Sequence, residues 1–206
     1  MIQTLDRIPH HIPPAPMRGA LDHMLDREFG SERWTLEAKM DGDRVLIYKH
    51  PDGTTEINTR RGLPLTEARG ARRVAELVER FPAGMCLEGE WVKGLDTLYL
   101  FDLLWDVPAP GRCVCLWKFP QRDRRLWLEW RVGQYAGPNV QVVPSVLHGF
   151  RFAYDRWQQM AGCEGVVVKR GSSPYEGSMV GTGIESRAWM KWRFAWDQAR
   201  AHLVAR

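Results

Sequence analysis

Lys39-Met40-Asp41-Gly42-Asp43-Arg44 is the stretch from which the fold and the chemistry of this chain can be argued. It lies between two strand-like runs, residues 34–40 and 44–50, and its Asp-Gly pair predicts a tight turn. A lysine at the end of an apolar strand, followed by a turn and an arginine, suits a nucleophile that attacks phosphorus and keeps the nucleotide as a covalent adduct. Such a lysine must lose its proton before it attacks, which burial or nearby cations favour.

The segments around this stretch predict an α+β fold of mostly antiparallel strands. Residues 34–40, 44–50 and 55–60, with a second turn at 51–54, are expected to form an antiparallel meander. Apolar periodicity along the rest of the chain predicts, in order, a helix over 66–81, strands over 85–92 and 97–105, an irregular segment over 106–118, a basic helix over 120–131, a strand over 140–143, a helix over 150–160, and strands over 165–169 and 188–194.

The two ends of the chain give weaker patterns. Residues 1–33 are expected to be an arm before a single domain over 34–206. Prolines early in the arm exclude regular structure there, and a short helix is expected near residues 20–29. The Gly- and Ser-rich segment 171–183 predicts a mobile loop, and 198–205 predicts a last strand.

Composition and charge limit the function classes only loosely. The 206 residues carry a formal net charge of +4, which is too mild to indicate a nucleic-acid partner. Local clusters are more basic, at Arg60-Arg61, Arg72-Arg73 and residues 122–131, and each is open to two interpretations, a solvated face or a contact with nucleic acid. Ten tryptophans, several of them beside arginines, fit an aromatic and basic surface without proving one.

The four cysteines and the N-terminus bear on the cellular compartment. No pair of cysteines has C-x-x-C spacing, which argues against zinc, and buried reduced thiols are expected instead. The polar, proline-rich N-terminus lacks a secretory pattern, and no apolar run approaches the length of a membrane span. An intracellular protein, cytoplasmic or associated with the nucleoid, and without a membrane partner, is therefore expected.

Four later segments add the side chains that nucleotidyl transfer needs. They are Glu88-Gly89-Glu90, Phe101-Asp102, the strand from Glu164 to Lys169, and Lys191 with Arg193, which alternate on one strand face. An aromatic ring can stack on a base, carboxylates can hold a divalent ion, and paired cations can neutralise phosphates. Each residue alone has an ordinary alternative: a surface lysine before a turn, a core phenylalanine or a surface arginine.

Taken in order, these segments resemble the motifs of the nucleotidyltransferase domain of ATP-dependent DNA ligases, within the superfamily that includes RNA ligases and mRNA capping enzymes. Residues 37–44 resemble the nucleophile motif, and Thr59-Arg60-Arg61-Gly62 is similar to the Ser-Arg-Asn-Gly element. The resemblance covers residues 34–193. It implies antiparallel sheets flanked by helices, with the ATP pocket between the sheets.

The resemblance also implies a mechanism. Lys39 would attack the α-phosphorus of ATP, release pyrophosphate and keep AMP. The AMP would pass to the 5′-phosphate at a break in duplex DNA, and the 3′-hydroxyl would attack that phosphate and expel AMP. Each step is an in-line displacement that needs charge neutralisation more than proton chemistry.

The family motifs give a role to each matching residue. Arg44 and Arg60 would contact ribose and the 5′-phosphate, and Glu90 would hold the ribose hydroxyl or Mg²⁺. Phe101 would stack on adenine, Glu37 would line the adenine pocket, and Glu164 would bind Mg²⁺. The residues implied to contact the α-phosphate are Lys169, Lys191 and Arg193. The basic positions Arg61, Arg124, Arg125 and Arg187 are expected to contact DNA.

The chain departs from the family pattern in three positions and in length. Glu88 stands where the family often has Asp, Arg61 where Asn is usual, and Arg193 where a second Lys is usual. No OB-fold domain is expected from this sequence, which has few residues after Arg193. The expectation is therefore a minimal ligase, a ligase completed by a partner protein that supplies an OB-type DNA clamp, or a module that binds nicks without joining them. The K-x-D-G-x-R form resembles the DNA-ligase branch, which implies nicked duplex DNA as the partner, and RNA joining or capping stays as an alternative.

Overall fold

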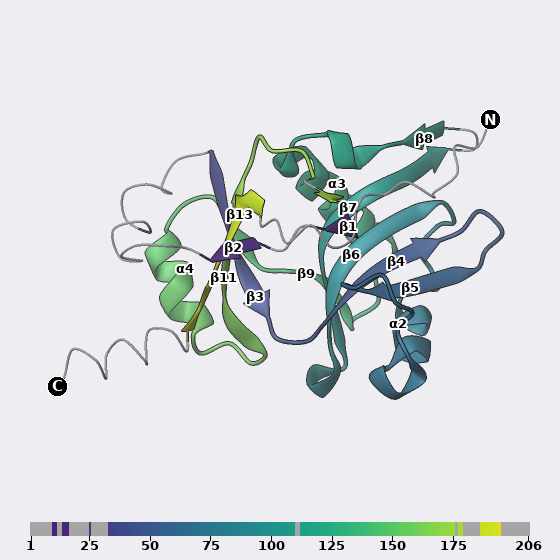
Figure 1. Ribbon diagram of the computed structural model, residues 1–206, viewed down its shortest axis with the longest axis horizontal. Helices are drawn as coiled ribbons and strands as arrows, with labels where there is room; N and C mark the ends of the chain where they lie inside the picture. Colours follow the sequence, from purple (N-terminus) through teal and green to yellow (C-terminus); the bar gives the residue numbers. More distant parts are fainter. Residues whose placement is uncertain are drawn as a thin grey trace.

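The computed structural model describes residues 10–11, 14–16, 25, 33–109, 112–175, 177–178 and 186–194. These residues build two main sheets that face each other, with helices on their outer sides (Figure 1). The first sheet has the strand order β10-β3-β11-β13-β2, and the second has the order β5-β4-β6-β7-β8, with β9 beside β7. The predicted α+β fold with antiparallel sheets is confirmed.

The bounds of the elements follow the chain. The strands are β1 (His10–His11), β2 (Pro14–Pro16), β3 (Trp34–Met40), β4 (Asp43–Lys49), β5 (Thr55–Thr59), β6 (Met85–Val92), β7 (Thr97–Ala109), β8 (Arg112–Val114), β9 (Val140–Val142), β10 (Ser145–Val146), β11 (Cys163–Arg170), β12 (Gly177–Ser178) and β13 (Ser186–Arg193). The helices are α2 (Ala71–Leu77), α3 (Gln121–Tyr135) and α4 (Phe150–Trp157), with 3-10 turns η2 (Glu67–Arg69), η3 (Lys93–Leu95) and η4 (Leu116–Lys118).

The first sheet packs its outer face on α4. Leu36 and Ala38 alternate along β3 and join Val166 of β11 in a core with Phe150 and Trp157. Since side chains alternate along a strand, the other face of β3 carries Glu37 and Lys39 away from this core. The strand therefore has two buried faces, one apolar and one polar.

The second sheet packs on α2 and α3. Val45, Ile47 and Leu100 form a core with Val74 of α2 and Leu128 of α3. A third, smaller core joins the two sheets, because Cys86 and Leu104 of the second sheet pack with Trp189 of the first. The sheets are thereby held together at one end while their inner faces stay apart at the other.

The predicted meander is wrong at its first connection. β3 pairs with β10 and β11, whereas β4 pairs with β5 and β6, so the Asp41-Gly42 turn crosses from one sheet to the other. The physical reason lies in the burial of β3, where Thr35 and Glu37 are buried as well as the apolar residues. A strand with two buried faces belongs between layers and not in a hairpin at the surface.

Several predicted boundaries also need correction. The helix predicted over 66–81 is broken by Gly70, whose φ of 100° separates η2 from α2. The segment predicted to be irregular contains the end of β7 and a hairpin to β8, and the basic helix continues to residue 135. Cys113 is exposed, so the expectation of four buried thiols is wrong.

The arm contains short strands in spite of its prolines. β2 lies at the edge of the first sheet, parallel to β13, which is a position where proline is tolerated because one side of an edge strand needs no donor. β1 pairs with β12, so the predicted loop over 171–183 contains a strand. The helix near 20–29 and the strand over 198–205 lie outside the described residues, apart from buried Leu25. Among the described residues, no helix is long and apolar enough to cross a bilayer.

Candidate active site

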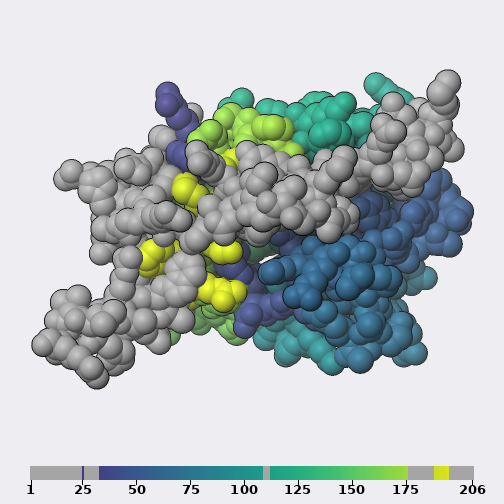
Figure 2. Space-filling view, viewed as in Figure 1, coloured from purple at the N-terminus to yellow at the C-terminus, as the bar shows by residue number. Residues whose placement is uncertain are grey.

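A cavity of about 710 Å³ lies between the inner faces of the two sheets, on both sides of the Asp41-Gly42 crossing. This volume is in the range of pockets that take a nucleotide-sized ligand. In the space-filling view, β13 (yellow) faces the blue part of the chain across a hollow (Figure 2). The cavity is lined by the following predicted residues: Glu37, Lys39, Arg44, Arg60, Arg61, Glu90, Phe101, Glu164, Lys169, Lys191 and Arg193.

Lys39 lies at the end of β3 with 19% of its side chain exposed. Its Nζ donates a hydrogen bond to Oε1 of Glu164 on the neighbouring strand β11. The other oxygen, Oε2, lies 3.2 Å from Nε of Arg193 on β13. Glu164 thus bridges the candidate nucleophile and a half-exposed cation.

A β-bulge aims Glu164 at the cavity. The register of β11 with β3 passes from Cys163↔Met40 to Gly165↔Lys39, which inserts Glu164 as an extra residue. Bulges re-aim side chains and are over-represented beside active sites. Gly165 is required here by close approach, because a Cβ at this position would lie 2.0 Å from the carbonyl oxygen of Trp192.

A second bulge places Phe101 in the same cavity. The register of β7 with β6 passes from Gly89↔Leu100 to Glu88↔Asp102 and inserts Phe101. Its ring centroid lies 5.2 Å from Cζ of Arg44 and 5.1 Å from Nζ of Lys169, both within reach of a cation–π interaction. Phe101 also meets the ring of Trp189 edge-on.

The guanidinium of Arg44 is held by the buried carboxylate of Glu88. Its Nε donates to Oε1 of Glu88 over 2.8 Å, and Glu88 is 2% exposed. Burial raises the pKa of Glu88, and the Arg44 guanidinium opposes that rise. Glu88, which stands where the family often has Asp, therefore fixes the position of the Arg44 side chain.

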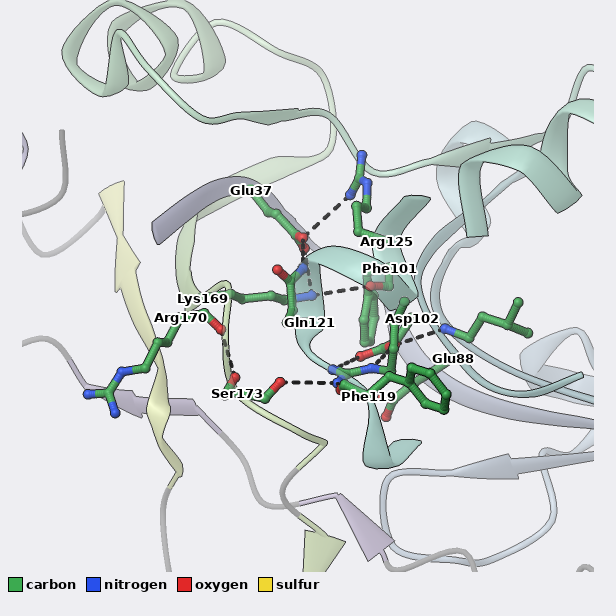
Figure 3. A network of polar contacts seen from close by, with 12 residues as sticks. Glu37, Glu88, Phe101, Asp102, Phe119, Gln121, Arg125, Lys169, Arg170 and Ser173 are labelled. Atoms are coloured by element: carbon green, nitrogen blue, oxygen red, sulfur yellow. Dashed lines mark hydrogen bonds and ion pairs between the residues drawn. The ribbon is translucent and has the colours of Figure 1, made fainter. Parts of the chain in front are cut away.

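The opposite end of the cavity is centred on Glu37. Its Oε2 lies 2.7 Å from Nζ of Lys169, which also donates to the carbonyl oxygen of Phe101 over 3.2 Å (Figure 3). Burial lowers the pKa of Lys169, while Glu37 opposes that shift. The ammonium of Lys169 is held by Glu37 and lies 4.0 Å from the ring centroid of Trp189, and its contact with the α-phosphate stays a prediction.

Glu90 and Glu164 are the pair of carboxylates that could hold Mg²⁺. Burial raises the pKa of Glu90 to about 7; Lys39 and Arg44 counteract the rise, and Glu164 adds to it. The described residues contain no group of three or more metal-ligating side chains. Two carboxylates fit Mg²⁺, which keeps several waters and takes phosphate oxygens as further ligands.

Comparison with known proteins finds the same fold in ATP-dependent ligases. Residues 18–97 match the family described as ATP dependent DNA ligase domain. The ligase domain from M. tuberculosis LigD has a TM-score of 0.62 at 21% sequence identity, over 88% of this chain and 59% of that one. The chain has the fold of an ATP-dependent ligase nucleotidyltransferase domain. The resemblance drawn from the sequence motifs is confirmed.

Ligases of both nucleic acids share the fold. An archaeal ATP-dependent RNA ligase matches with a TM-score of 0.55 at 22% identity, over 92% of this chain and 50% of that one. The ATP-dependent DNA ligase from bacteriophage T7, solved with ATP, matches with a TM-score of 0.51 at 16% identity, over 90% and 68%. Comparison with curated proteins finds no match. Since this chain spans 59% and 60% of the first two solved structures that it matches, the activity of a whole ligase is a matter for proposal.

Two arginines of α3 that were predicted to contact DNA, Arg124 and Arg125, are buried. Arg124 is 0% exposed and makes a two-pronged ion pair with Asp102, with both N–O distances at 2.8 Å. Arg125 is also buried and donates to Glu129 and to the carbonyl oxygen of Val143. The prediction that Arg124 and Arg125 contact DNA is therefore corrected. The side chain of Arg187 lies outside the described part of the chain.

Arg60 and Arg61, both predicted from the sequence, are exposed at the rim of the cavity. Arg69, which also lines the cavity, pairs with Asp43 and was missed from the sequence. Trp189 was missed as well, although it alternates with Lys191 and Arg193 along β13 and so shares their face. That alternation was a signal available from the sequence.

If Lys39 is the nucleophile predicted from the sequence, replacing Gly42 with alanine should slow nucleotide transfer to it by about 10²-fold. A Cβ at Gly42 would lie 2.4 Å from the backbone oxygen of Trp91, so the crossing between the sheets must shift and carry Lys39 with it. The rate of covalent labelling with ATP measures the effect. Gly94→Ala is the matched control, because a Cβ there meets nothing within 4 Å. An unchanged rate in Gly42→Ala would contradict the tight fit of this turn.

The raised pKa of Glu90 predicts a pH-dependent difference in stability between the wild type and Glu90→Gln. The folded state holds the Glu90 proton up to a pKa of about 7, above the ordinary value of 4.5. This contribution is complete below the ordinary value and is lost as the pH rises through about 7. Urea unfolding should therefore show the wild type losing stability relative to Glu90→Gln between pH 5 and pH 8. Parallel curves for the two proteins would reject the raised pKa.

Proposed function

We propose that this chain is an ATP-dependent polynucleotide ligase that seals nicks in duplex DNA through AMP held on Lys39. The observation that supports this most directly is the position of Lys39, where the chain crosses between two sheets inside a nucleotide-sized cavity. Carboxylates and cations surround the amine, as in-line displacement at phosphorus requires. The fold is that of ligase nucleotidyltransferase domains.

The proposed role of each cavity residue follows from its position in the cavity. Glu37, Phe101 and Trp189 would receive the base at one end, and Lys191 and Arg193 would neutralise the phosphates. Mg²⁺, held by Glu90 and Glu164, would add charge neutralisation at the phosphate oxygens. Lys39 must give up its contact with Glu164 and its proton before it attacks the α-phosphorus. The bond to pyrophosphate breaks as the bond from Nζ forms.

The later steps take place at the rim. The exposed Arg60 and Arg61 are suited to bind the backbone phosphates beside the break, which would bring the 5′-phosphate to AMP on Lys39. The 3′-hydroxyl then attacks the adenylated phosphate, and AMP leaves. A partner protein that closes over the far side of the duplex is part of this proposal.

Joining of a nicked duplex by the purified chain tests the proposal. The chain is expected to seal the nick with ATP and Mg²⁺, and to seal a nick whose 5′-phosphate already carries AMP without added ATP. If only the second substrate is sealed, self-adenylylation is wrong. If neither is sealed and the chain binds nicks with a log–log salt slope of about 0.9 per phosphate contact, the protein is a binding module.

RNA joining is the second candidate, and the match to an archaeal ATP-dependent RNA ligase favours it. Nicked RNA and nicked DNA duplexes of the same sequence should be compared in the same assay. Faster sealing of the RNA duplex would overturn the assignment to DNA. Transfer of the nucleotide to an RNA with a 5′-diphosphate end would indicate capping chemistry instead.

A further inference from the structure

Gln121 is a buried side chain of the base end that the proposed chemistry does not use. It is the first residue of α3 and is 1% exposed. Its Nε2 donates to Oε1 of Glu37 over 3.2 Å (Figure 3). Its own amide oxygen is buried and finds no hydrogen-bond partner among the described residues.

An unpaired buried amide oxygen is costly, so it needs an explanation. A methionine at this position would fill a similar space and leave no polar atom unpaired. The amide is therefore not the best solution for stability alone. Its donor group, in contrast, is used, because it holds one oxygen of the Glu37 carboxylate.

The donors around Glu37 come from two directions. Lys169 holds Oε2 at 2.7 Å from the strand β11. Gln121 and Arg125 approach Oε1 from α3, where they lie one turn apart on the same face. Arg125 lies 3.4 Å away and is committed to Glu129 and to the carbonyl oxygen of Val143, so Gln121 makes the shorter contact with Oε1.

The amide of Gln121 is itself held in place. Its backbone N–H donates to the carbonyl oxygen of Ser173, and the next N–H, of Arg122, donates to Gly171. These bonds satisfy the first turn of α3, whose donors have no partner within the helix. The segment after β11 therefore fixes Gln121, and Gln121 fixes Glu37.

We propose that Gln121 is a positioning residue for base selection, which holds the Glu37 carboxylate so that the cavity takes a 6-aminopurine nucleotide and rejects a 6-oxopurine nucleotide. A 6-amino group donates to a carboxylate, whereas a 6-oxo group only accepts and is repelled by it. If Gln121 is lost, the carboxylate can turn away. The ammonium of Lys169 is then less firmly engaged and can donate to a 6-oxo group. This inference rests on the proposed function, since it requires a nucleotide in this cavity.

The test compares ATP with inosine triphosphate, which replaces the 6-amino group by a 6-oxo group. Covalent labelling of Lys39 is measured with each nucleotide for the wild type and for Gln121→Met. We expect the ratio of kcat/KM for ATP over inosine triphosphate to fall by about tenfold in the variant, chiefly through a higher KM for ATP. Gln134→Met, an exposed position of the same helix, is the control and should keep the wild-type ratio.

A merely structural role gives a different result. If Gln121→Met slows labelling by both nucleotides equally and leaves the ratio unchanged, the inference is overturned. If the wild type takes no label at all, the proposed function fails, and binding of AMP and IMP measured by calorimetry tests the base end separately. An AMP over IMP preference that falls in Gln121→Met supports the inference in that case; equal preference in both proteins overturns it. Thermal unfolding confirms that the variants are folded.

Discussion

Lys39→Ala is expected to lose covalent labelling by ATP carrying a labelled α-phosphate, with a fall of at least about 10³-fold. The amine is the group that would form the bond to phosphorus, and attack by water in its place would release free AMP and leave no label on the protein. Lys39→Arg should be equally inactive, because it keeps a cation beside Glu164 without a nucleophilic amine. Gel separation of labelled protein measures the result.

Sealing of a pre-adenylated nick separates the role of Lys39 in capture from a role in folding. That reaction needs no attack by lysine, so Lys39→Ala should retain most of it. Lys118→Ala is the matched control, because Lys118 is exposed and lies over the ring of Trp117, outside the cavity. Retained labelling in Lys39→Ala, or label mapped to another lysine, would remove Lys39 from the mechanism.

Arg124→Ala is expected to lower the free energy of unfolding by about 3–5 kcal/mol. The guanidinium is fully buried, pairs with Asp102 and donates to the carbonyl oxygen of Phe119, so its removal leaves a buried carboxylate unpaired. Urea unfolding measures the loss. Arg122→Ala on the same helix should change stability by less than about 0.5 kcal/mol, because Arg122 is exposed.

A double variant distinguishes a structural pair from a DNA contact. Arg124→Met with Asp102→Leu removes both charges and should recover part of the stability lost in Arg124→Ala. If Arg124→Ala is as stable as the wild type but binds nicked DNA more weakly, the surface role predicted from the sequence would be correct after all.

The strands of this ligase fold and many of the residues that line the cavity were predictable, because they follow short-range rules. The alternation of Lys191 and Arg193, the Asp-Gly turn and the apolar runs depend on neighbours in sequence. The two bulges could not be predicted, since each is a mismatch between strands far apart in the chain. Yet these bulges bring Glu164 and Phe101 to the cavity.

The face of α3 was misread for a related reason. Its buried positions include Arg124 and Arg131, whose partners Asp102 and Asp106 lie on β7. Its exposed positions include Leu126 and Trp130. The rule that charged residues lie on the exposed face of a helix fails here, because carboxylates of a strand distant in sequence pair with the buried arginines.

The crossing at Asp41-Gly42 has a consequence for biosynthesis. All strands of the second sheet lie between residues 43 and 142, whereas the first sheet takes strands from both sides of that segment. We expect the second sheet to assemble while the ribosome still holds the rest of the chain, because its pairings are more local. Ribosome-stalled chains long enough to bring residue 142 out of the exit tunnel should resist trypsin across residues 43–142 and be cut after Lys39. Lys39 would then stay outside any folded sheet until β10 and β11, the pairing partners of β3, have left the ribosome.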